Sequence, residues 1–576
     1  MEITRTRKRA RSTRRARTAS AGTALILAGG LLAACGGTST SPSASPTSAS
    51  VSGHSRSTSK VLTVTTGAAG TFADNFNPFS PNAEDPAHGM IYEPLYFFDT
   101  AKAGVSDPWL ATSYAWSNGG KTLTFQLRHG VKWTNGTPFT SADVAFTFNL
   151  IKSNPALNGY GLPLVRATTS GPYTAVVEFS RPAYSDLEYV AGLTYILPES
   201  IWKSVKDPAT FLDTHPVGTG AYEVSKVAGS VMKLTANPDY YMRGMPHFKT
   251  IEFLSFKGNT SSDLAIENGS LDWAGSYIPN IKREYLAKNR KFVVSDIPLS
   301  VEFLVPNLVK GPTSSLAVRR AISDAIDRNL VSSDVYQGYA EPTSPAGLLV
   351  PNFDSVLSTS ASKARFTYSA SAARKVLEDA GYKMGSNGIF DSPSGKPLDI
   401  NVKVVSGYTD YIESLQIMVP ELKAAGIDLI VDQEAYAQFT SDQDTGNFQL
   451  LIDNFGYTPL PYVFYNDLLN GSTTPAIGKT DTVGNYGRYN NPSVNAALSS
   501  ISAAPSTSTV LSDYATIEKQ FLADEPLIPL FDQQDEQEFN GNVVTGEPTP
   551  KNPYAADAVY IAPDLGWVAM RLRPVS

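Results

Sequence analysis

Apolar and polar residues alternate in the part of the chain that begins near residue 60. Val61–Thr65 alternates before a loop, and Leu123, Phe125 and Leu127 occupy every second position of a later stretch. Asn118–Gly120, directly before that stretch, allows the positive φ angles of a tight turn. The pattern predicts a β-rich region that contains a β-hairpin.

Helical spacing follows the hairpin and returns in the middle of the chain. Thr140–Asp143 has the form of a capping box, with an aspartate in the position of the usual glutamate, and predicts a helix that ends before Pro155. Residues 317–330 carry Val318 and Ile322 on one face of the clearest helical pattern in the sequence. We expect one continuous helix over that range.

Strand and helix patterns alternate in the second half of the chain. A helix over residues 372–382 precedes a strand over 398–405, and a second helix, ending at Gly426, precedes a strand over 427–431. This alternation predicts an α/β layer with parallel strand pairing. Pro420 lies inside the second helix and should kink or divide it.

The N-terminus has the pattern of an export signal that ends at the only cysteine of the chain. Eight basic residues among the first twenty precede an apolar run over residues 24–34. A membrane-spanning helix would need roughly 20 apolar residues, so this run is too short to be a permanent span. Leu32–Cys35 resembles the bacterial lipoprotein box, which implies that Cys35 is acylated and becomes the first residue of the mature chain. The route of export stays open between the general and the twin-arginine pathway.

Residues 36–60 differ in composition from everything that follows them. They include ten serines and four threonines and almost no apolar side chain. Such a segment cannot bury enough apolar surface to offset its ordering entropy. It predicts a flexible tether between a lipid anchor and a folded body.

Charge and motifs exclude several classes of function. The formal net charge of −7 argues against a nucleic-acid surface, which needs clustered cations. The sequence contains no Gly-x-Ser-x-Gly, Walker-loop or His-Glu-x-x-His motif, and its five histidines have no ligand-like spacing. Val217–Ala221 lacks the third glycine of a phosphate cradle and is better interpreted as a structural turn. We therefore expect no catalytic residues, no metal site and no cofactor.

Seven motifs follow one another along the body of the chain. They are Ile91–Tyr96, Pro108–Ser113 leading to Leu127–Trp133, Asn135–Val144, Pro216–Tyr222, Asn237–Tyr241, Val318–Arg328 and Tyr489–Val494. In their residues and their order they resemble the extracytoplasmic solute-binding proteins of ABC importers, in the branch that holds dipeptide and oligopeptide binders.

This resemblance implies an α/β fold with two lobes of the periplasmic-binding-protein type and an additional β-rich domain. The implied limits are 1–34 for the lipoprotein signal peptide, 35–60 for the tether, 61–103 and 217–305 for two parts of lobe I, 104–216 for the β-rich domain, 306–545 for lobe II and 546–576 for a C-terminal return to lobe I.

The resemblance also implies a receptor without enzymatic activity. Solute would bind between the lobes, favour the closed form, and be delivered to permease subunits in the membrane. The protein would be a monomer, held on the extracytoplasmic face of the cell membrane by lipid at Cys35. Two rivals are a secreted, lipid-anchored hydrolase and a nickel or metal-chelate receptor, and the scarcity of histidine disfavours the second.

The class of solute is less defined than the fold. Peptide binders of this branch commonly place an aspartate for the peptide amino terminus after a strand such as residues 448–452, but here Asp453–Tyr465 contains prolines and aromatics instead. Aromatic rings suit the apolar faces of sugars. We expect an oligopeptide-like solute, with an oligosaccharide as the alternative. The candidate ligand-binding residues, any of which could instead be core, are Phe72, Trp273, Asn454, Tyr457, Tyr462 and Trp567.

Overall fold

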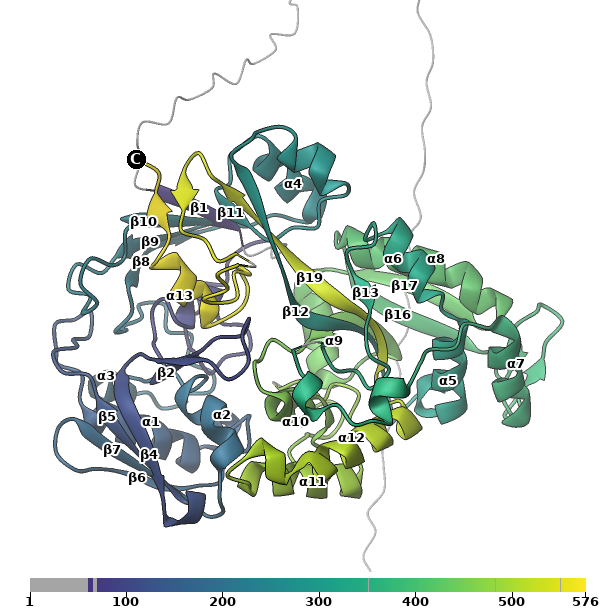
Figure 1. The fold of residues 1–576 in the computed structure, drawn as a ribbon, viewed down its shortest axis with the longest axis horizontal. Coiled ribbons are helices and arrows are strands. Elements are labelled where there is room, and N and C mark those ends of the chain that lie inside the picture. Colours follow the sequence, from purple (N-terminus) through teal and green to yellow (C-terminus); the bar gives the residue numbers. More distant parts are fainter. Residues whose placement is uncertain (1–60, 66–69, 351, 482, 550) are drawn as a thin grey trace, which may run out of the picture. The chain divides into compact units, whose positions relative to one another are not determined.

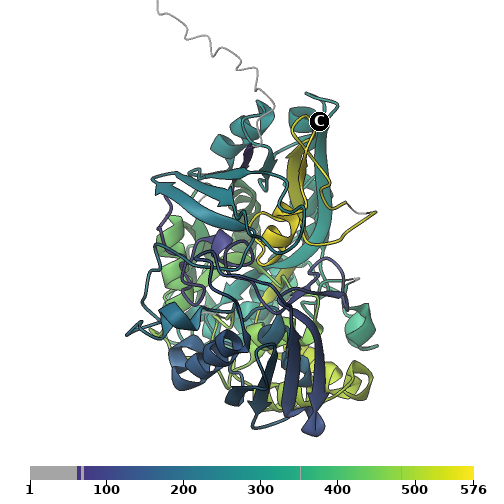
Figure 2. The same ribbon diagram turned by 90° about the vertical axis from the view of Figure 1, so that its left-hand side faces the viewer.

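Two long antiparallel strands, β12 (Phe292–Pro306) and β19 (Ile528–Asn540), run side by side through the largest sheet (Figures 1 and 2). The computed structural model describes residues 61–65, 70–350, 352–481, 483–549 and 551–576, and these belong to one compact unit. The strand order is β17-β16-β18-β12-β19-β11-β1-β10-β9-β8, with β13 paired to β19. The two long strands therefore join two groups of strands, which we call lobe I (β1, β8–β11) and lobe II (β16–β18).

Lobe I is built around the first described strand. β1 pairs in parallel with β10 and β11, and β8, β9 and β10 form an antiparallel extension. Its elements are β1 (Val61–Thr65), β8 (Tyr222–Ala228), β9 (Val231–Ala236), β10 (Thr250–Leu254), β11 (Trp273–Ala274) and α4 (Asn259–Glu267). Smaller pairs are β2 (Tyr96–Phe98) with β3 (Ser106–Pro108), and β20 (Val544–Thr545) with β21 (Arg573–Pro574), next to α13 (Asp564–Ala569).

A separate four-stranded antiparallel sheet, with the order β4-β5-β7-β6, is formed between β3 and β8 in the chain, and we call this sheet and its helices the β-rich unit. The predicted hairpin is confirmed, since β5 pairs with β4 across Asn118–Gly120, whose φ angles are 50°, 60° and 80°. The predicted capping box is also present, with the Thr140 amide donating to Asp143 Oδ2 at 2.9 Å. The elements are β4 (Ala111–Ser117), β5 (Thr122–Leu127), α1 (Ser141–Ser153), β6 (Leu164–Thr169), β7 (Thr174–Phe179), α2 (Leu187–Ala191) and α3 (Glu199–Trp202).

Lobe II has the parallel α/β layer that the alternating patterns predict. β16 pairs in parallel with both β17 and β18. The strands are β13 (Glu341–Pro342), β14 (Lys383–Met384), β15 (Phe390–Asp391), β16 (Asp399–Val405), β17 (Asp428–Glu434) and β18 (Leu450–Phe455). The helices are α5 (Leu316–Ala325), α6 (Arg328–Asp334), α7 (Ala370–Asp379), α8 (Thr409–Ala424), α9 (Tyr436–Thr445), α10 (Pro461–Leu469), α11 (Pro492–Ala503) and α12 (Leu511–Asp524).

One helix prediction in lobe II was wrong, and the prediction of a kink or a division at Pro420 is answered only for the division. The pattern over residues 317–330 forms two helices, because the Asp327 side chain accepts hydrogen bonds from the amides of Asn329 and Leu330 and so starts a new helix. α8 is not divided at Pro420. The carbonyl that loses its amide partner there belongs to Gln416, an exposed residue, so water can satisfy it.

The segment Val217–Ala221 is a structural turn, as its sequence indicates. A Cβ on Gly218 would lie 1.8 Å from the carbonyl oxygen of Ile91, and one on Gly220 would lie 2.1 Å from that of Met90. The glycines are needed because two backbones meet here.

The predictions for the N-terminus and the domain limits stay predictions. Cys35, the signal peptide and the tether lie outside the described residues. Within the described part of the chain, no helix has both the length and the apolar character needed to cross a membrane.

Candidate functional site: a cavity between the lobes

A cavity of about 640 Å³ lies where lobe I, lobe II and the strand β19 meet. This volume is in the range of pockets that enclose most of a small organic ligand. Lobe I contributes parts of residues 71–85 and 275–281. Lobe II contributes parts of residues 335–340, 405–411, 436–444 and 452–457, together with Tyr486. The strand β19 contributes Gln533 and Glu536, and the C-terminal segment contributes Tyr560. Because both lobes form its walls, any change in their separation changes the site.

The lining has an unusual chemical composition. It includes nine tyrosines, which are Tyr277, Tyr336, Tyr339, Tyr408, Tyr411, Tyr436, Tyr457, Tyr486 and Tyr560. It includes six carboxylates, which are Glu84, Asp85, Asp410, Asp444, Asp453 and Glu536, and six side-chain amides. No lysine, arginine or histidine is among the described residues that line the cavity.

Burial shifts the titration of the acidic groups. It raises the pKa of Glu84 and of Asp444 to about 7, and for Asp444 the charge of nearby Asp481 adds to the effect. It raises the pKa of Asp410 and of Asp453 to about 6. Loss of water on burial is the largest cause of each shift, and for Asp444 the nearby Arg488 charge offsets part of it.

The carboxyl ends of the parallel strands supply most of the lobe II wall. Tyr408 and Asp410 follow β16, Tyr436 follows β17, and Asp453 lies near the end of β18. Side chains after adjacent parallel strands meet at one edge of the sheet, which is where α/β folds usually bind ligands.

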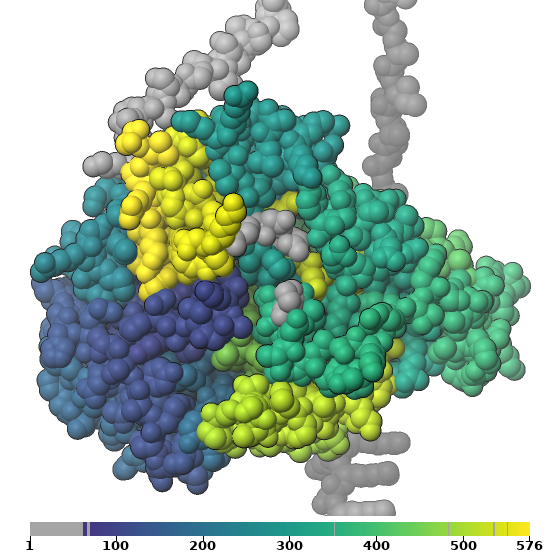
Figure 3. All heavy atoms as spheres, in the orientation of Figure 1, coloured from purple at the N-terminus to yellow at the C-terminus, as the bar shows by residue number. Residues whose placement is uncertain are grey.

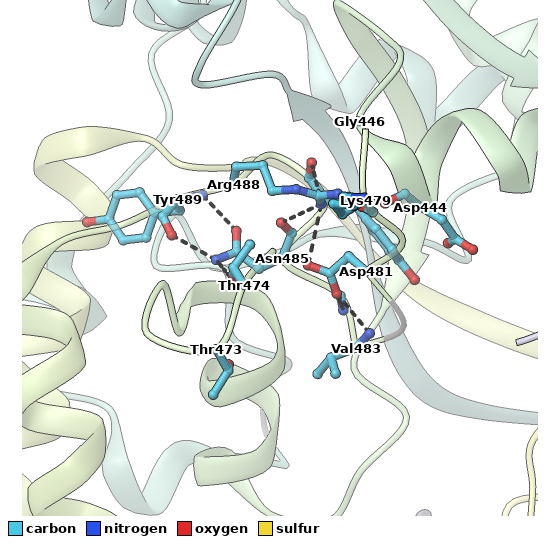
Figure 4. Close-up of polar contacts among 12 residues, drawn as sticks. Asp444, Gly446, Thr473, Thr474, Lys479, Asp481, Val483, Asn485, Arg488 and Tyr489 are labelled. Atoms are coloured by element: carbon cyan, nitrogen blue, oxygen red, sulfur yellow. Dashed lines mark hydrogen bonds and ion pairs between the residues drawn. The ribbon is translucent and has the colours of Figure 1, made fainter. Parts of the chain in front are cut away.

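The buried side chain of Arg488 connects two segments of this wall by hydrogen bonds. The Arg488 guanidinium lies 3.4 Å from Asp481 and donates to the carbonyl oxygens of Asp444 at 2.6 Å and Lys479 at 3.0 Å (Figure 4). It also donates to the carbonyl of Tyr486 at 3.2 Å. Arg488 thus ties the end of α9 to the loop that carries Tyr486, and holds two lining residues in position.

The lobes touch directly at one rim of the cavity. The amide of Asn259 in lobe I donates to the Gly407 carbonyl in lobe II at 3.1 Å, and its side chain donates to Thr409 and Asp410, each at 3.3 Å. A Cβ on Gly407 would lie 2.9 Å from the Gly258 Cα atom. This contact requires two glycines because it is backbone against backbone.

A second contact joins lobe II to the β-rich unit, where α11 meets the segment before α2 (Figure 3). Asp186 is paired with Arg181 at 3.3 Å and accepts hydrogen bonds from Tyr462 at 3.0 Å and from Ser502. Glu188 accepts from Thr458 at 2.9 Å.

One more hydrogen bond in the same interface has its donor in the β-rich unit and its acceptor in lobe II. Tyr189, of the β-rich unit, donates from its hydroxyl to Asp467 of lobe II at 2.5 Å. Lobe II and the β-rich unit are therefore joined by several side-chain hydrogen bonds, with donors on both sides.

Two of the six residues selected from sequence line the cavity. Asn454 and Tyr457 lie in its wall and hydrogen-bond to each other, and Asn454 also donates to Ser300 at 3.1 Å.

The other four selected residues are buried and are not among the lining residues. Phe72 is 9% exposed, Trp273 packs against Phe539, and Trp567 stacks on Phe97 with ring centroids 4.5 Å apart. Tyr462 lies in the contact with the β-rich unit. The rule for the carboxyl ends of parallel strands could have identified Tyr408, Tyr436 and Asp453 from the predicted strands instead.

Comparison with known proteins finds a matching family model and relatives of similar sequence. The family model for bacterial extracellular solute-binding proteins, family 5, matches residues 107–475. A protein of Agrobacterium fabrum named "probable peptide-binding protein" is 22% identical over 81% of this chain and 84% of its own length.

Solved structures extend the likeness over nearly the whole fold. An oligopeptide ABC transporter periplasmic binding protein of Thermotoga maritima, bound to mannohexaose, is 25% identical with a TM-score of 0.81, over 89% of this chain and 98% of the other. An oligopeptide-binding protein of Bacillus subtilis, in complex with a nonapeptide, is 20% identical with a TM-score of 0.76, over 90% and 99%. The chain belongs to the bacterial extracellular solute-binding proteins, family 5.

Proposed function

We propose that this protein is the solute-binding component of an ABC importer and captures an oligopeptide-like solute for delivery to a membrane permease. The observation that carries the proposal is the 640 Å³ cavity, whose walls come from both lobes and from β19, one of the two strands that join them. Relatives named as peptide-binding proteins support the class of solute.

The mechanism is a shift between two forms. In an open form each lobe would offer one wall to the solute, and in the closed form both walls contact it. A solute favours the closed form only by the extra contacts it makes there. β12 and β19 are the natural hinge, because their pairing is irregular between Pro298 and Ser300 and between Val301 and Phe303. The closed form then presents both lobes to the permease, and the solute leaves unaltered.

An oligosaccharide is the second candidate solute. The nine lining tyrosines and six amide side chains are groups that pack on sugar rings and bond to hydroxyls. Asn454 and Tyr457, two of the residues selected from sequence, are proposed as ligand contacts.

The anchor is proposed from sequence. An acyl-modified Cys35 would hold the receptor on the extracytoplasmic face of the membrane through the Ser/Thr-rich tether. Two or more acyl chains anchor a protein stably without a membrane-spanning helix.

Thermal unfolding of the leaderless protein against peptide and oligosaccharide panels tests the function. A solute at 100 times its dissociation constant stabilises the bound form by about 2.7 kcal/mol, which is readily measured. Mass spectrometry of the recovered solute should show the original molecule. Failure of every panel member, or recovery of cleaved solute, would overturn the proposal.

A further inference from the structure

Asn259 of lobe I directs its hydrogen-bond donors to lobe II. Among the described residues it donates three hydrogen bonds, and all three acceptors lie in the segment 407–410 of lobe II. The acceptors are the Gly407 carbonyl oxygen, 3.1 Å from the main-chain nitrogen, and the side-chain oxygens of Thr409 and Asp410, each 3.3 Å from Nδ2. An asparagine has one main-chain and two side-chain N–H groups, so this contact uses every donor that the residue has.

Lobe I holds Asn259 in place from the other side. Asn259 is the first residue of α4, and Ser262 Oγ donates to its carbonyl oxygen at 2.8 Å. The hydroxyl oxygens of Ser262 and Ser276 lie 2.9 Å apart, and Ser276 donates to Asp263 at 2.6 Å. Ser276 also lines the cavity. The position of Asn259 is therefore fixed to the lobe I wall of the cavity.

Asp410 is the charged partner on the lobe II side. It lies in the first turn of α8, lines the cavity and is 8% exposed. Taking a carboxylate out of water costs free energy unless hydrogen bonds replace the water. The Asn259 amide supplies one of these bonds from the opposite lobe, and it opposes the rise that burial causes in the pKa of Asp410.

The contact between Asn259 and residues 407–410, which we call the latch, is made of groups that can separate again. Amide, hydroxyl, carboxylate and carbonyl groups all bond to water when the lobes move apart, so each bond of the latch adds only a modest net stabilisation. These bonds exist only when the lobes are together. They therefore favour the closed form by their own free energy, separately from any contact with the solute.

We propose that Asn259 is a positioning residue that latches the closed form, and that its side-chain bonds to Thr409 and Asp410 set how long the lobes stay together around the solute. The inference rests on the proposed function, because it concerns closure of the same cavity. The latch acts on the lobes themselves, so its effect is present with and without solute.

Single-molecule fluorescence transfer between the lobes measures the lifetime of the closed form. Dyes are attached at Lys226→Cys on β8 and Lys383→Cys on β14, both exposed, in leaderless protein with Cys35→Ser, which removes the only natural cysteine. Lifetimes are recorded without solute and with the peptide tetra-alanine. Asn259→Ala removes two hydrogen bonds, one of them to a carboxylate, and should shorten the closed lifetime about 10- to 100-fold.

An exchange of the two groups separates the latch from a direct contact with the solute. Asn259→Asp places a second carboxylate beside Asp410 and should shorten the closed lifetime more than Asn259→Ala does. The measurement is made at pH 8, where Asp410 is ionised because its pKa is about 6. Adding Asp410→Asn restores an amide–carboxylate pair with donor and acceptor exchanged, and the lifetime should return to within about threefold of the wild type. Thr409 fits either arrangement, because a hydroxyl both donates and accepts.

Asn149→Ala is the matched control. The Asn149 side chain also makes two hydrogen bonds, one to the carbonyl oxygen and one from the amide of Ala167, but both groups lie within the β-rich unit. This variant should lower the unfolding temperature and leave the closed lifetime unchanged.

Two results would overturn the latch. One is an Asn259→Ala variant with the closed lifetime of the wild type, including the case in which all variants show one and the same transfer state. The other is an Asn259→Asp variant that Asp410→Asn does not rescue. A lack of response to tetra-alanine counts against the proposed peptide capture alone, since the lifetimes of the empty protein still decide the latch.

Discussion

The glycine contact between the lobes allows closure to be perturbed without touching the solute. Gly407→Ala would place a Cβ 2.9 Å from both the Gly258 Cα atom and the Lys257 carbonyl oxygen, where ordinary contacts begin near 3.4 Å. Neither atom can move away without moving its backbone. Closing the lobes should therefore cost about 1–3 kcal/mol more, as in other overpacked contacts. At 1.4 kcal/mol for each tenfold change, this predicts roughly 5- to 150-fold weaker solute binding.

The assay must separate closure from backbone strain. Gly407 has a φ of 97°, so alanine there is strained in any form of the protein. Gly395→Ala is the matched control, because its φ is 78° and nothing lies within 4 Å of the added Cβ. Both variants should lose similar unfolding temperature, and only Gly407→Ala should lose affinity in calorimetry.

An unstrained variant completes the test. Gly258 has an extended backbone with a φ of 168°, and a Cβ there would lie 3.0 Å from the Gly407 Cα atom. Gly258→Ala should weaken binding by a smaller factor without a strain cost. If Gly407→Ala binds within twofold of Gly395→Ala, the contact is not part of closure and the reasoning is refuted.

Three further predictions address stability and location. Burial raises the pKa of Glu188 from 4.5 to about 8, so the wild-type protein should lose stability as the pH rises from 5 to 9. Glu188→Gln should have the same unfolding temperature as the wild type at pH 5 and a higher one at pH 9. Equal unfolding temperatures at both pH values would contradict the shift. Arg488→Met removes the ion-pair partner of buried Asp481 and a hydrogen-bond donor to the surrounding carbonyl oxygens, and it should cost about 3–5 kcal/mol in urea unfolding. Arg365→Met, at the exposed surface, should cost little. Cys35→Ser should release the protein from membranes on fractionation, and continued tight association would contradict the lipid anchor.

Local patterns predicted the local elements well. The hairpin at residues 122–127, the capping box at Thr140 and the parallel layer of lobe II all depend on neighbouring residues, and all are present. The pairing of β12 with β19 joins segments more than 200 residues apart, and no local pattern contains that information. The prediction of a single helix over residues 317–330 was wrong because one side chain, Asp327, accepts two backbone hydrogen bonds.

The site residues were harder to identify for a related reason. An aromatic side chain looks the same in sequence whether it fills a core or faces a cavity, and Trp273 and Trp567 fill the core. What distinguishes Tyr408 and Tyr436 is their position after parallel strands, which requires the sheet to be known first. The charge of the cavity is less visible still, because its six carboxylates come from five separate places in the chain, on both lobes and a joining strand.

The acidic lining and the closing motion are physically linked. Asp85 belongs to lobe I, whereas Asp444 and Asp453 belong to lobe II, and all three act on Tyr436 in the structure. Burial in this form raises the pKa of Asp453 to about 6 and the pKa of Asp444 to about 7, so forming the cavity costs free energy wherever these groups are ionised. Contacts of the solute with both walls must offset that cost, because a solute favours the closed form only through the contacts that it gains there.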